Sequence, residues 1–457
     1  MSVPDTSPQT VTKSVGEESL QPQTTRIMGR WSYLFAWMGG CVSIGTFTMG
    51  SSLVGTLNLL QSVLAMAIGC VVIAIGLVLN GAAGYKFGIP FMVQARTSFG
   101  VQGSRIAGLV RALPAIVWYG FQSWIGAGAL NAVTATLFGF DHIVLWFIAF
   151  QGLQIGLSIL GFQGIKWLEN FGAIFILLAL MYMLYSVIVR YGADLQESFI
   201  VTQGTWGKPF WGATMLFLGI YATMMLNVSD YSREHRKGSS PGVLGSIYVL
   251  AILPVTMFMG MIGLLVSEAT GAVDPVDVFA NAVDNTPLLV ITLLFIAFAQ
   301  MTTNVLNNVI PPTYVLMDMF NMHFRPASIL VGLLAPATFP WLLVRDESAA
   351  GLQIFVQTYS AFLGPIFIIM VLDYYVLRRR ELSIPDLYDM TGRFKGWNVA
   401  AIIATAVGVA FALPFSDLGW YISLVPAGVT YYILVTRLPA SRRFNSTHLR
   451  STLKENA

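Results

Sequence analysis

The 457-residue sequence has few charges and few residues of the kinds that bind metals or form crosslinks. Only 10% of its residues are charged, compared with about 25% in an ordinary soluble domain, which excludes that class. Its two cysteines, Cys41 and Cys70, lie in apolar segments, so we expect neither a disulfide framework nor a cysteine metal site. The histidines lie in predicted loops or the C-terminal tail without clustering; they are His142, His235, His323 and His448.

Long apolar segments fill the chain instead. Hydrophobic residues make up 56% of it and form about a dozen runs of roughly 20 residues. A helix of roughly 20 apolar residues crosses a bilayer, and in lipid the backbone polar groups must pair within their own segment. The sequence therefore predicts an all-α polytopic membrane protein with about 12 transmembrane helices. The expected spans are residues 31–57, 60–82, 107–137, 143–162, 167–189, 209–229, 241–267, 287–310, 326–344, 352–377, 397–413 and 418–436.

Lysine and arginine are distributed unevenly among the connections. Cytoplasmic loops collect these residues, and this arrangement, with the N-terminus inside, places 22 of the 25 on one side. The inner ones are Lys13, Arg26, Arg30, Lys86, Arg96, Arg105, Arg111, Lys166, Arg233, Arg236, Lys237, Arg325, Arg378, Arg379, Arg380, Arg393, Lys395, Arg437, Arg442, Arg443, Arg450 and Lys454. The outer ones are Arg190, Lys208 and Arg345. We therefore expect a multi-pass protein of the cell membrane (plasma or inner), with both termini cytoplasmic.

The N-terminal segment has a different composition from the rest of the chain. Its first 25 or so residues are rich in Ser, Thr, Gln and Pro and lack the apolar stretch of a signal peptide. We expect residues 1–30 to form a disordered cytoplasmic tail. The net charge of +3 reflects membrane orientation, so we expect no nucleic-acid partner.

Two spans contain glycines and polar residues, which are unfavourable in lipid unless they line a cavity or a helix contact. The first contains the run GGCVSIGT at residues 39–46. The sixth contains Gly219, Thr223, Asn227, Ser229 and Asp230. Close packing of small residues between helices would also explain either span. Interrupted spans in corresponding positions of two repeats mark a transporter's midplane site, so the pair predicts free backbone carbonyls for a cation and N–H groups for a substrate.

The eighth span carries two threonines and three asparagines within ten residues. Helical spacing puts Ala299, Thr302 and Thr303 on one face and Asn304 and Asn308 on another. Hydroxyl and carbonyl oxygens suit a hard monovalent cation such as Na⁺, and the alternative is that the threonines bond to carbonyls of their own helix. Asparagine cannot satisfy all its groups on its own backbone, so we expect at least one of the three to face a polar cavity.

The third span carries Trp118 and Gln122, which lie four residues apart and so on one helix face. A flat ring for stacking beside an amide with donors and an acceptor suits a planar, neutral heterocycle that forms hydrogen bonds. An aromatic residue in a membrane helix usually packs against its neighbours. The adjacent glutamine favours a functional site, because a buried amide needs partners.

Four groups of motif residues occur in order along the chain. They are Gly88, Ile89, Pro90, Phe91, Arg96, Ser98, Phe99, Gly100 and Gly103; Trp118, Tyr119, Gly120, Gln122 and Trp124; Leu226, Asn227, Val228, Ser229, Asp230, Tyr231, Ser232 and Arg233; and Asp373, Tyr374, Tyr375, Arg378, Arg379, Arg380, Asp386, Leu387 and Tyr388. With these motifs the chain resembles the nucleobase–cation symporter family one, whose hydantoin, allantoin, uracil and cytosine permeases it matches over nearly its full length.

The resemblance implies a LeuT-like fold, in which two five-helix inverted repeats are followed by two further helices. It places the first repeat (spans 1–5) in residues 31–190 and the second (spans 6–10) in residues 191–377. Spans 11 and 12, with a basic cytoplasmic loop, then occupy residues 378–436, and a second cytoplasmic tail occupies residues 437–457. We expect the protein to be a monomer.

The resemblance also implies secondary active uptake of a nucleobase, allantoin, hydantoin or similar ring, driven by Na⁺ or H⁺. The family's stacking Trp and hydrogen-bonding Gln fall on Trp118 and Gln122, and its eighth-span Asn falls on Asn308. A second stacking aromatic falls on Tyr221. The Na⁺ ligands of members that have such a site map to Gly39, Val42, Ala299, Thr302 and Thr303.

Two positions depart from the best-known hydantoin transporter of this family. That protein has Trp where Tyr221 stands and Gln where Ser43 stands, so the resemblance implies a pocket of different size and hydrogen bonding. We therefore expect a substrate other than hydantoin itself. The predicted pocket contains no Asp or Glu, which argues against a cationic vitamin such as thiamine, because a buried charge needs a partner.

The leading interpretation is a cation-coupled symporter for a neutral heterocycle. An uncoupled channel or uniporter for the same solutes is the alternative, and the Thr302–Thr303 pair opposite a broken first span argues against it. An intramembrane enzyme would need a nucleophile–base pair or a metal cluster, whereas Asp230 and Asp373 lie at span ends without a His or Cys partner. We expect no enzymatic activity and no cofactor, with Na⁺ as a candidate coupling ion.

Overall fold

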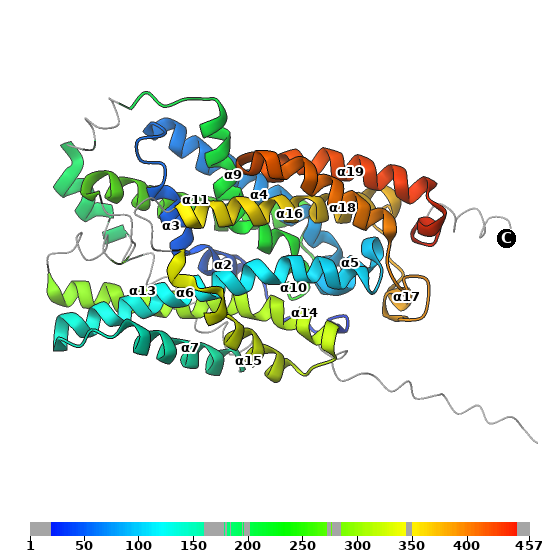
Figure 1. Cartoon of the computed structure of the whole chain (residues 1–457), viewed down its shortest axis with the longest axis horizontal. Coiled ribbons are helices and arrows are strands. Elements are labelled where there is room, and N and C mark those ends of the chain that lie inside the picture. Colours follow the sequence, from blue (N-terminus) through cyan, green and yellow to red (C-terminus); the bar gives the residue numbers. More distant parts are fainter. Residues whose placement is uncertain are drawn as a thin grey trace, which may run out of the picture.

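A computed structural model describes residues 20–159, 178, 181–182, 184–193, 195, 202–271, 276, 285–343 and 350–445 of the chain. The secondary structure in these ranges is helical, apart from one isolated bridge between Met28 and His235. Most helices run along the long axis of the molecule (Figure 1). Their arrangement is that of a bundle in which backbone groups pair within each segment, as lipid requires.

Helices occupy every expected span except most of the fifth, residues 167–189, which lies largely outside the described residues. The bounds are α2 Arg30–Cys41, α3 Ile44–Ser51, α4 Leu59–Phe87, α5 Phe91–Phe99, α6 Gly103–Phe138, α7 Ile143–Ile159, α9 Lys208–Leu226, α10 Ser229–Ser232, α11 Pro241–Thr270, α13 Thr286–Asn304, the π-helix η1 Val305–Val309, α14 Ile310–Phe320, α15 Phe324–Leu334, α16 Ala350–Leu372, the π-helix η4 Asp373–Leu377, α17 Ile384–Tyr388, α18 Val399–Ala412 and α19 Gly419–Arg437.

Six helical stretches within the described residues are long and apolar enough to cross a membrane. One of them, residues 399–437, consists of α18 and α19, which pack against each other (Figure 1). The ninth expected span, residues 326–344, differs from expectation. Its regular helix ends at Leu334, and two 3₁₀ turns begin at Pro336 and Pro340, because proline cannot continue the hydrogen bonds of an α-helix.

Local sequence explains where the helices begin and end. The Asn58 side chain accepts a hydrogen bond from the Gln61 backbone, and the Gln61 side chain accepts one from the Asn58 backbone, so a capping box starts α4. The same helix ends at Gly88, whose φ of 75° is a left-handed conformation that glycine adopts without strain. Ser240 caps α11, and Pro241 occupies its first turn.

The first span packs closely against α11 through glycines. A Cβ atom at Gly50 would overlap the backbone carbonyl of Gly260, and one at Gly263 would overlap that of Phe47. Small residues of this kind allow two helix backbones to approach in a membrane protein. The contact fixes α3, the second half of the broken span, beside α11.

The two spans predicted to be interrupted break at different depths. The first breaks in its middle, where Val42 and Ser43 separate α2 from α3. The sixth remains helical through Leu226 and breaks only at Asn227 and Val228, near its end. The sixth span is thus interrupted at Asn227, one of the residues named for it, but near its end and not at the midplane. The Asn227 side chain accepts a hydrogen bond from Arg111 and donates one to Asp230, which accounts for the position of the break.

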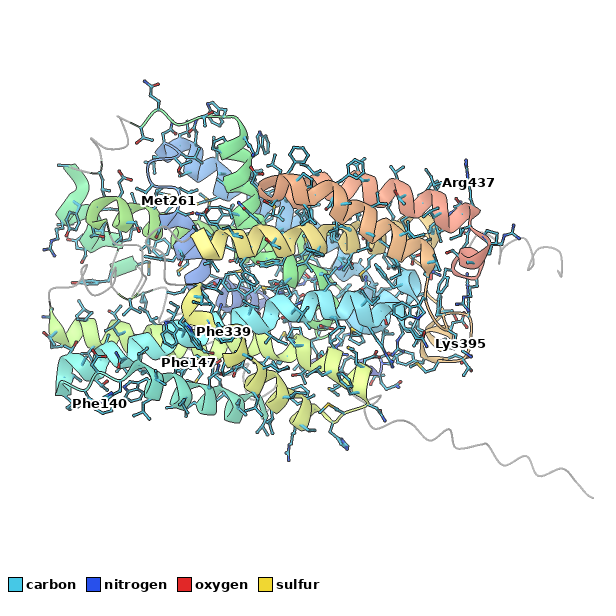
Figure 2. All side chains as sticks on the ribbon, in the orientation of Figure 1. Phe140, Phe147, Met261, Phe339, Lys395 and Arg437 are labelled. Carbon is cyan, nitrogen blue, oxygen red and sulfur yellow. The ribbon has the colours of Figure 1, made fainter. Side chains whose placement is uncertain are left out.

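Basic residues gather at one end of the molecule. Lys395 and Arg437 lie at the right-hand end in Figure 2, whereas Phe140 lies at the opposite end. We call the end that carries Lys395 and Arg437 the basic end. Two arginines counted with the inner basic residues are not solvated, because Arg96 is 2% exposed and Arg111 is fully buried within α6.

Candidate functional site

All five residues predicted to bind substrate line one small cavity in the centre of the bundle. Its volume is about 20 Å³. Its lining consists of Gly40, Ser43, Trp118, Gln122, Ile220, Tyr221, Thr223, Met224, Asn307 and Asn308. The residues come from the broken first span, α6, α9 and η1, four segments distant in sequence. A space of this size holds about one water molecule, so a heterocycle would bind only after the lining side chains or helices move apart.

Trp118 is held in a fixed orientation beside the cavity. Its indole N–H donates to the Tyr359 hydroxyl at 3.2 Å, and that hydroxyl donates to the Gly219 carbonyl at 2.8 Å. Phe121 packs edge-on against the indole with ring centroids 5.5 Å apart. Gly45 borders the far edge of the ring, where a Cβ atom would overlap it. The absence of a side chain at Gly45 thus makes room for the ring, which presents a flat apolar surface suited to stacking.

Gln122 and Asn308 face each other across the cavity, one helical turn from Trp118. The Asn308 amide donates to Gln122 Oε1 at 3.5 Å, which is long for such a bond, and to Asn304 Oδ1 at 2.8 Å. Within the described residues the Gln122 amide nitrogen has no hydrogen-bond partner. The pair therefore offers a donor and weakly held amide groups to a bound molecule.

The eighth span widens where these asparagines lie. Residues Val305–Val309 form a π-helix, a rare turn that often occurs at functional sites. Asn304, just before it, is fully buried and donates to the Tyr119 carbonyl, Ser123 Oγ and Gln154 Oε1. Asn308, within it, lines the cavity instead. The α-helical spacing used in the sequence analysis places both on one face but does not reveal the wide turn between them.

Tyr221 and Ser43 complete the cavity wall and bond to its surroundings. The Tyr221 hydroxyl donates to the Cys41 carbonyl at 3.2 Å and pairs with Thr256 Oγ1 at 2.8 Å. Ser43 Oγ accepts from the Gly45 backbone N–H at 3.2 Å and so caps α3. The Tyr221 hydroxyl and Ser43 Oγ therefore both bond to the broken first span. The ring of Tyr221 is the part of that residue suited to contact a substrate.

One hydrogen bond links the two spans that carry the residues predicted to hold Na⁺. Thr303 Oγ1 donates to the Gly39 carbonyl at 3.4 Å, so this threonine bonds across to the first span instead of to its own helix. The same carbonyl accepts from the Val42 N–H at 3.1 Å. The expectation that the Gly39 carbonyl is unpaired is therefore wrong, because a tight turn closes the end of α2. Ala299 is buried nearby on α13, and the side chain of Thr302 lies outside the described residues.

A buried arginine lies beside the cavity on its basic-end side. Arg111 Nε donates to Asn227 Oδ1 at 2.8 Å, and its Nη2 donates to the Asn307 carbonyl at 3.1 Å. Asn227 in turn donates to Asp230 at 3.0 Å, and Asp230 accepts from the Phe91 backbone N–H at 2.8 Å. Arg111 lies inside the expected third span, residues 107–137, although it was counted with the cytoplasmic basic residues. Its spacing of seven residues from Trp118 was the signal that both lie on the inward face of α6.

The cavity lining contains no carboxylate and no cation. Its polar groups are three hydroxyls, three side-chain amides and the Trp118 indole N–H, and Arg111 bonds to the Asn307 carbonyl. A charged ligand in the cavity would lack a partner of opposite sign, which is unfavourable in a buried site. The geometry favours a neutral, planar molecule that hydrogen-bonds at its edge.

Comparisons with known proteins agree with this geometry. A family model described as a permease for cytosine/purines, uracil, thiamine and allantoin matches residues 21–435. The chain is 28% identical to the hydantoin permease of Microbacterium maritypicum, over 91% of this chain and 86% of that protein. It is 30% identical to an allantoin permease of Bacillus subtilis, over 92% of this chain and 93% of that protein.

A solved structure is similar over almost the whole length of both chains. It is that of Mhp1, a nucleobase-cation-symport-1 family transporter, in a closed conformation with bromovinylhydantoin bound. The TM-score is 0.83 at 27% identity, and the match covers 94% of this chain and 98% of that chain. This likeness confirms the LeuT-like fold that the sequence predicts.

Proposed function

The chain belongs to the family of permeases for cytosine/purines, uracil, thiamine and allantoin, and we propose that it imports a neutral, planar nitrogen heterocycle by cation symport. As a member of this family it is a membrane transporter and not an enzyme. The substrate class, the coupling ion and the direction of transport are the parts of this statement that we propose.

The observation that carries the substrate class is the placement of Gln122 and Asn308 beside Trp118. A ring stacked on Trp118 would present its edge to both amides, whose own contact at 3.5 Å is weak. Breaking this weak amide–amide bond costs little free energy, and the new bonds to a substrate replace it. Nucleobases and allantoin or hydantoin rings carry alternating N–H and C=O groups that suit two amides.

Tyr221 and Ser43 favour a substrate other than hydantoin itself. The phenol ring of Tyr221 is smaller than an indole, and its hydroxyl is already bonded to Cys41 and Thr256. Ser43 is bonded to the backbone of Gly45. Both residues therefore contribute to the shape of the substrate pocket more than to its hydrogen bonding. Allantoin, uracil and cytosine are the candidates to test first.

For the coupling ion we propose Na⁺ at the crossing of α13 and the first span. Gly39, Val42 and Ala299 would supply main-chain oxygens, and Thr302 and Thr303 would supply hydroxyls. The 3.4 Å bond between Thr303 and the Gly39 carbonyl supports this, because it brings oxygens from the two spans together. Neutral oxygens of this kind suit Na⁺. Rotation of the threonine hydroxyl would turn its oxygen toward the ion and free one acceptor position of the Gly39 carbonyl, which keeps its bond to the Val42 N–H.

We propose alternating access in which the first span moves relative to α10 and α11. On the basic-end side of the cavity, the Tyr33 and Tyr248 hydroxyls lie 2.8 Å apart. Trp37 packs edge-on against Tyr231 and Tyr248, with ring centroids 5.5 and 5.2 Å away. This aromatic layer closes the path to the basic end, so release of a substrate there requires the layer to separate.

The orientation and repeats are part of the same proposal. We place the basic end in the cytoplasm, with both tails there, because lysine and arginine mark cytoplasmic segments. We assign residues 31–190 and 191–377 to the two repeats, and we propose that a single protomer contains the whole site. Cys41 and Cys70 are at most 1% exposed, so a cysteine introduced at Lys395 would report orientation by labelling with little background.

Uptake of radiolabelled allantoin, uracil, cytosine and hydantoin into cells or proteoliposomes tests this proposal. Each candidate is measured with and without an imposed Na⁺ gradient at constant pH. We expect one of the first three to accumulate only with the gradient. Equilibration without accumulation would favour the uncoupled uniporter, and accumulation driven by a pH gradient alone would favour protons.

A further inference from the structure

A second and larger cavity lies at the basic end. Its volume is about 610 Å³. The C-terminal end of α4, the segment before α11 with the start of that helix, and the segment after α16 form its walls. Its lining residues are Val78, Ala82, Tyr85, Lys86, Lys237, Gly238, Ser239, Pro241, Leu244, Tyr374, Tyr375, Arg379, Arg380 and Glu381. None of these lines the central cavity, so the two sites are distinct.

Positive charge dominates this larger cavity. Four cations, Lys86, Lys237, Arg379 and Arg380, surround one carboxylate, Glu381. Glu381 pairs with Lys86 at 2.8 Å. Across the part of the chain that the structure describes, the other three cations form no ion pair with a carboxylate. The cavity therefore holds three uncompensated positive charges, which favour an anion.

The neighbouring Arg378 has a structural role, in contrast to the arginines of the cavity. Arg378 is 7% exposed, pairs with Asp373 at 2.6 Å and donates to the carbonyls of Thr97 and Phe444. Arg379 and Arg380, the next two residues, are exposed and lack such partners among the described residues. Their φ angles of 51° and 66° are left-handed, a conformation that is unfavourable for arginine and recurs at functional sites.

The start of α11 adds to the positive potential. This 30-residue helix begins at Pro241, which lines the cavity, and the N-terminus of a helix carries a partial positive charge. Tyr85 Oη accepts the Ser239 N–H at 2.8 Å and fixes the segment that leads into the helix. A phosphate group in the cavity would thus meet cationic side chains and a helix N-terminus together.

An apolar stripe leads away from the cavity along α4. Val78 and Ala82 line the cavity, and Ile75 and Val71 continue the same helix face at spacings of three and four residues. Val71 is 42% exposed and Ile75 is 55% exposed. Since α4 is long and apolar enough to cross a membrane, this exposed stripe faces lipid. The stripe matches an acyl chain, which a soluble phosphate ester does not have.

We propose that this cavity binds the phosphate headgroup of an anionic phospholipid, with an acyl chain along the stripe of α4. Anionic lipids are enriched in the cytoplasmic leaflet, where basic pockets between transmembrane helices bind such headgroups. The proposal goes beyond substrate transport and depends on the membrane location of the chain. A failure of lipid binding would leave the central cavity and its substrate unaffected.

The test is lipid binding to the purified full-length chain in detergent. Phosphatidylglycerol, phosphatidylcholine with the same acyl chains, and inorganic phosphate are each added. Bound lipid is counted by native mass spectrometry, and the melting temperature is recorded. We expect phosphatidylglycerol alone to bind and to raise the melting temperature, because a ligand of the native state stabilises it.

The variant Lys237→Gln/Arg379→Gln removes two of the unpaired cations. We expect it to weaken phosphatidylglycerol binding by about 30-fold, and each single variant by about fivefold, since each cation near the headgroup contributes to affinity. The charge-conserving variant Lys237→Arg/Arg379→Lys keeps the binding. The control Arg325→Gln/Lys395→Gln removes two exposed cations outside the cavity and leaves the affinity unchanged.

Three results would overturn the proposal. Equal binding of phosphatidylcholine would show that the headgroup charge is not recognised. An equal loss in the control variant would show attraction to the whole basic surface instead of this cavity. Full stabilisation by inorganic phosphate would assign the cavity to a soluble phosphate compound. The single variants keep the test decisive if the double variant does not fold.

Discussion

The central cavity and the basic end hold their polar groups in opposite ways. At the basic end, buried charges are paired closely: Arg96 lies 2.6 Å from Asp318, and both side chains are 2% exposed. In the cavity the groups are uncharged, and the amides of Gln122 and Asn308 meet at 3.5 Å. The paired charges of the basic end stabilise the fold, whereas the weakly bonded amides of the cavity can exchange one hydrogen-bond partner for another.

The partners at the basic end also come from distant segments. Arg96, on α5, donates to the Leu387 carbonyl as well as to Asp318 on α14. Tyr431, on α19, donates to Asp373, the first residue of η4. These bonds join residues of five helices, α5, α14, α17, α19 and η4, in a frame at the basic end. Gln122 and Asn308 take no part in these bonds, so we expect that they can change hydrogen-bond partner without disturbing the fold.

The largest expected effect is the loss of a buried partner at the basic end. Asp318→Ala leaves the Arg96 guanidinium buried without its carboxylate, which costs about 3–5 kcal/mol of stability. We expect a low yield and a much lower melting temperature in detergent. The control Glu381→Ala breaks a pair whose side chains are 44% and 70% exposed, which costs about 0–1 kcal/mol. Similar melting temperatures for the two variants would contradict the comparison.

The next effect concerns stacking in the cavity. Trp118→Ala removes the stacking surface, which is worth about 1–3 kcal/mol for a base, so substrate binding weakens by about tenfold or more. Trp118→Phe keeps an aromatic face and retains part of the affinity, although it loses the hydrogen bond to Tyr359. Isothermal titration of the purified variants measures both. Normal transport by Trp118→Ala at subsaturating substrate and equal expression would remove Trp118 from the site.

A smaller and more selective effect is expected for the two amides. Gln122→Ala or Asn308→Ala removes one partner of a hydrogen bond to substrate, which costs about 1–3 kcal/mol when the other partner stays unpaired. The loss is unequal across analogues that lack one ring donor or acceptor. Competition with such analogues separates the two residues. Identical losses for every analogue would assign the amides to folding, like Asn304.

The smallest expected effect is a pH dependence at the basic end. His235, between α10 and α11, stacks on Tyr33 and Tyr85 with ring centroids 4.7 and 5.7 Å away. Burial lowers the pKa of His235, and the nearby Arg26 and Arg30 lower it further. In the unfolded chain the histidine pKa is about 6.5, so below that pH the unfolded state binds more protons than the folded state. The contribution of neutral His235 to the free energy of unfolding is therefore fully present above about pH 6.5 and is lost as the pH falls below it.

Melting temperatures at about pH 7.5 and about pH 5.5 test this, since the two values lie on either side of the ordinary histidine pKa. The wild type should lose stability at the lower pH, and His235→Gln should lose less, because it has no titrating group there. An equal loss in both proteins would place the sensitive group elsewhere.

The sequence predicted the residues that line the cavity better than it predicted the residues on other helices that hold them in place. Trp118 and Gln122 follow helical spacing, so their shared face could be read from the chain. Asn308 was assigned by the family resemblance, and the structure brings all three to one cavity. Tyr359 was missed, because its role depends on a hydrogen bond between α6 and α16 that spacing on one helix does not reveal.

Long-range hydrogen bonds also explain the errors. The sequence pattern did not say where the sixth span breaks among its polar residues. The break lies at Asn227, near the end of the span, where the Asn227 side chain bonds to Arg111 and Asp230. The π-helix at Val305–Val309 departs from the 3.6-residue period on which the prediction depended. Both features are set by contacts between helices and not by local preference.

The central claim is that cation and substrate bind together, and the most direct test is substrate binding to the purified protein across a sodium series at fixed pH and ionic strength. The account predicts that affinity rises with sodium, and that substrate raises sodium affinity by the same factor. Thr303→Ala, which removes one hydroxyl beside the Gly39 carbonyl, should reduce this response without reducing expression. A response of the wild type that stays flat across the series would contradict sodium coupling through binding.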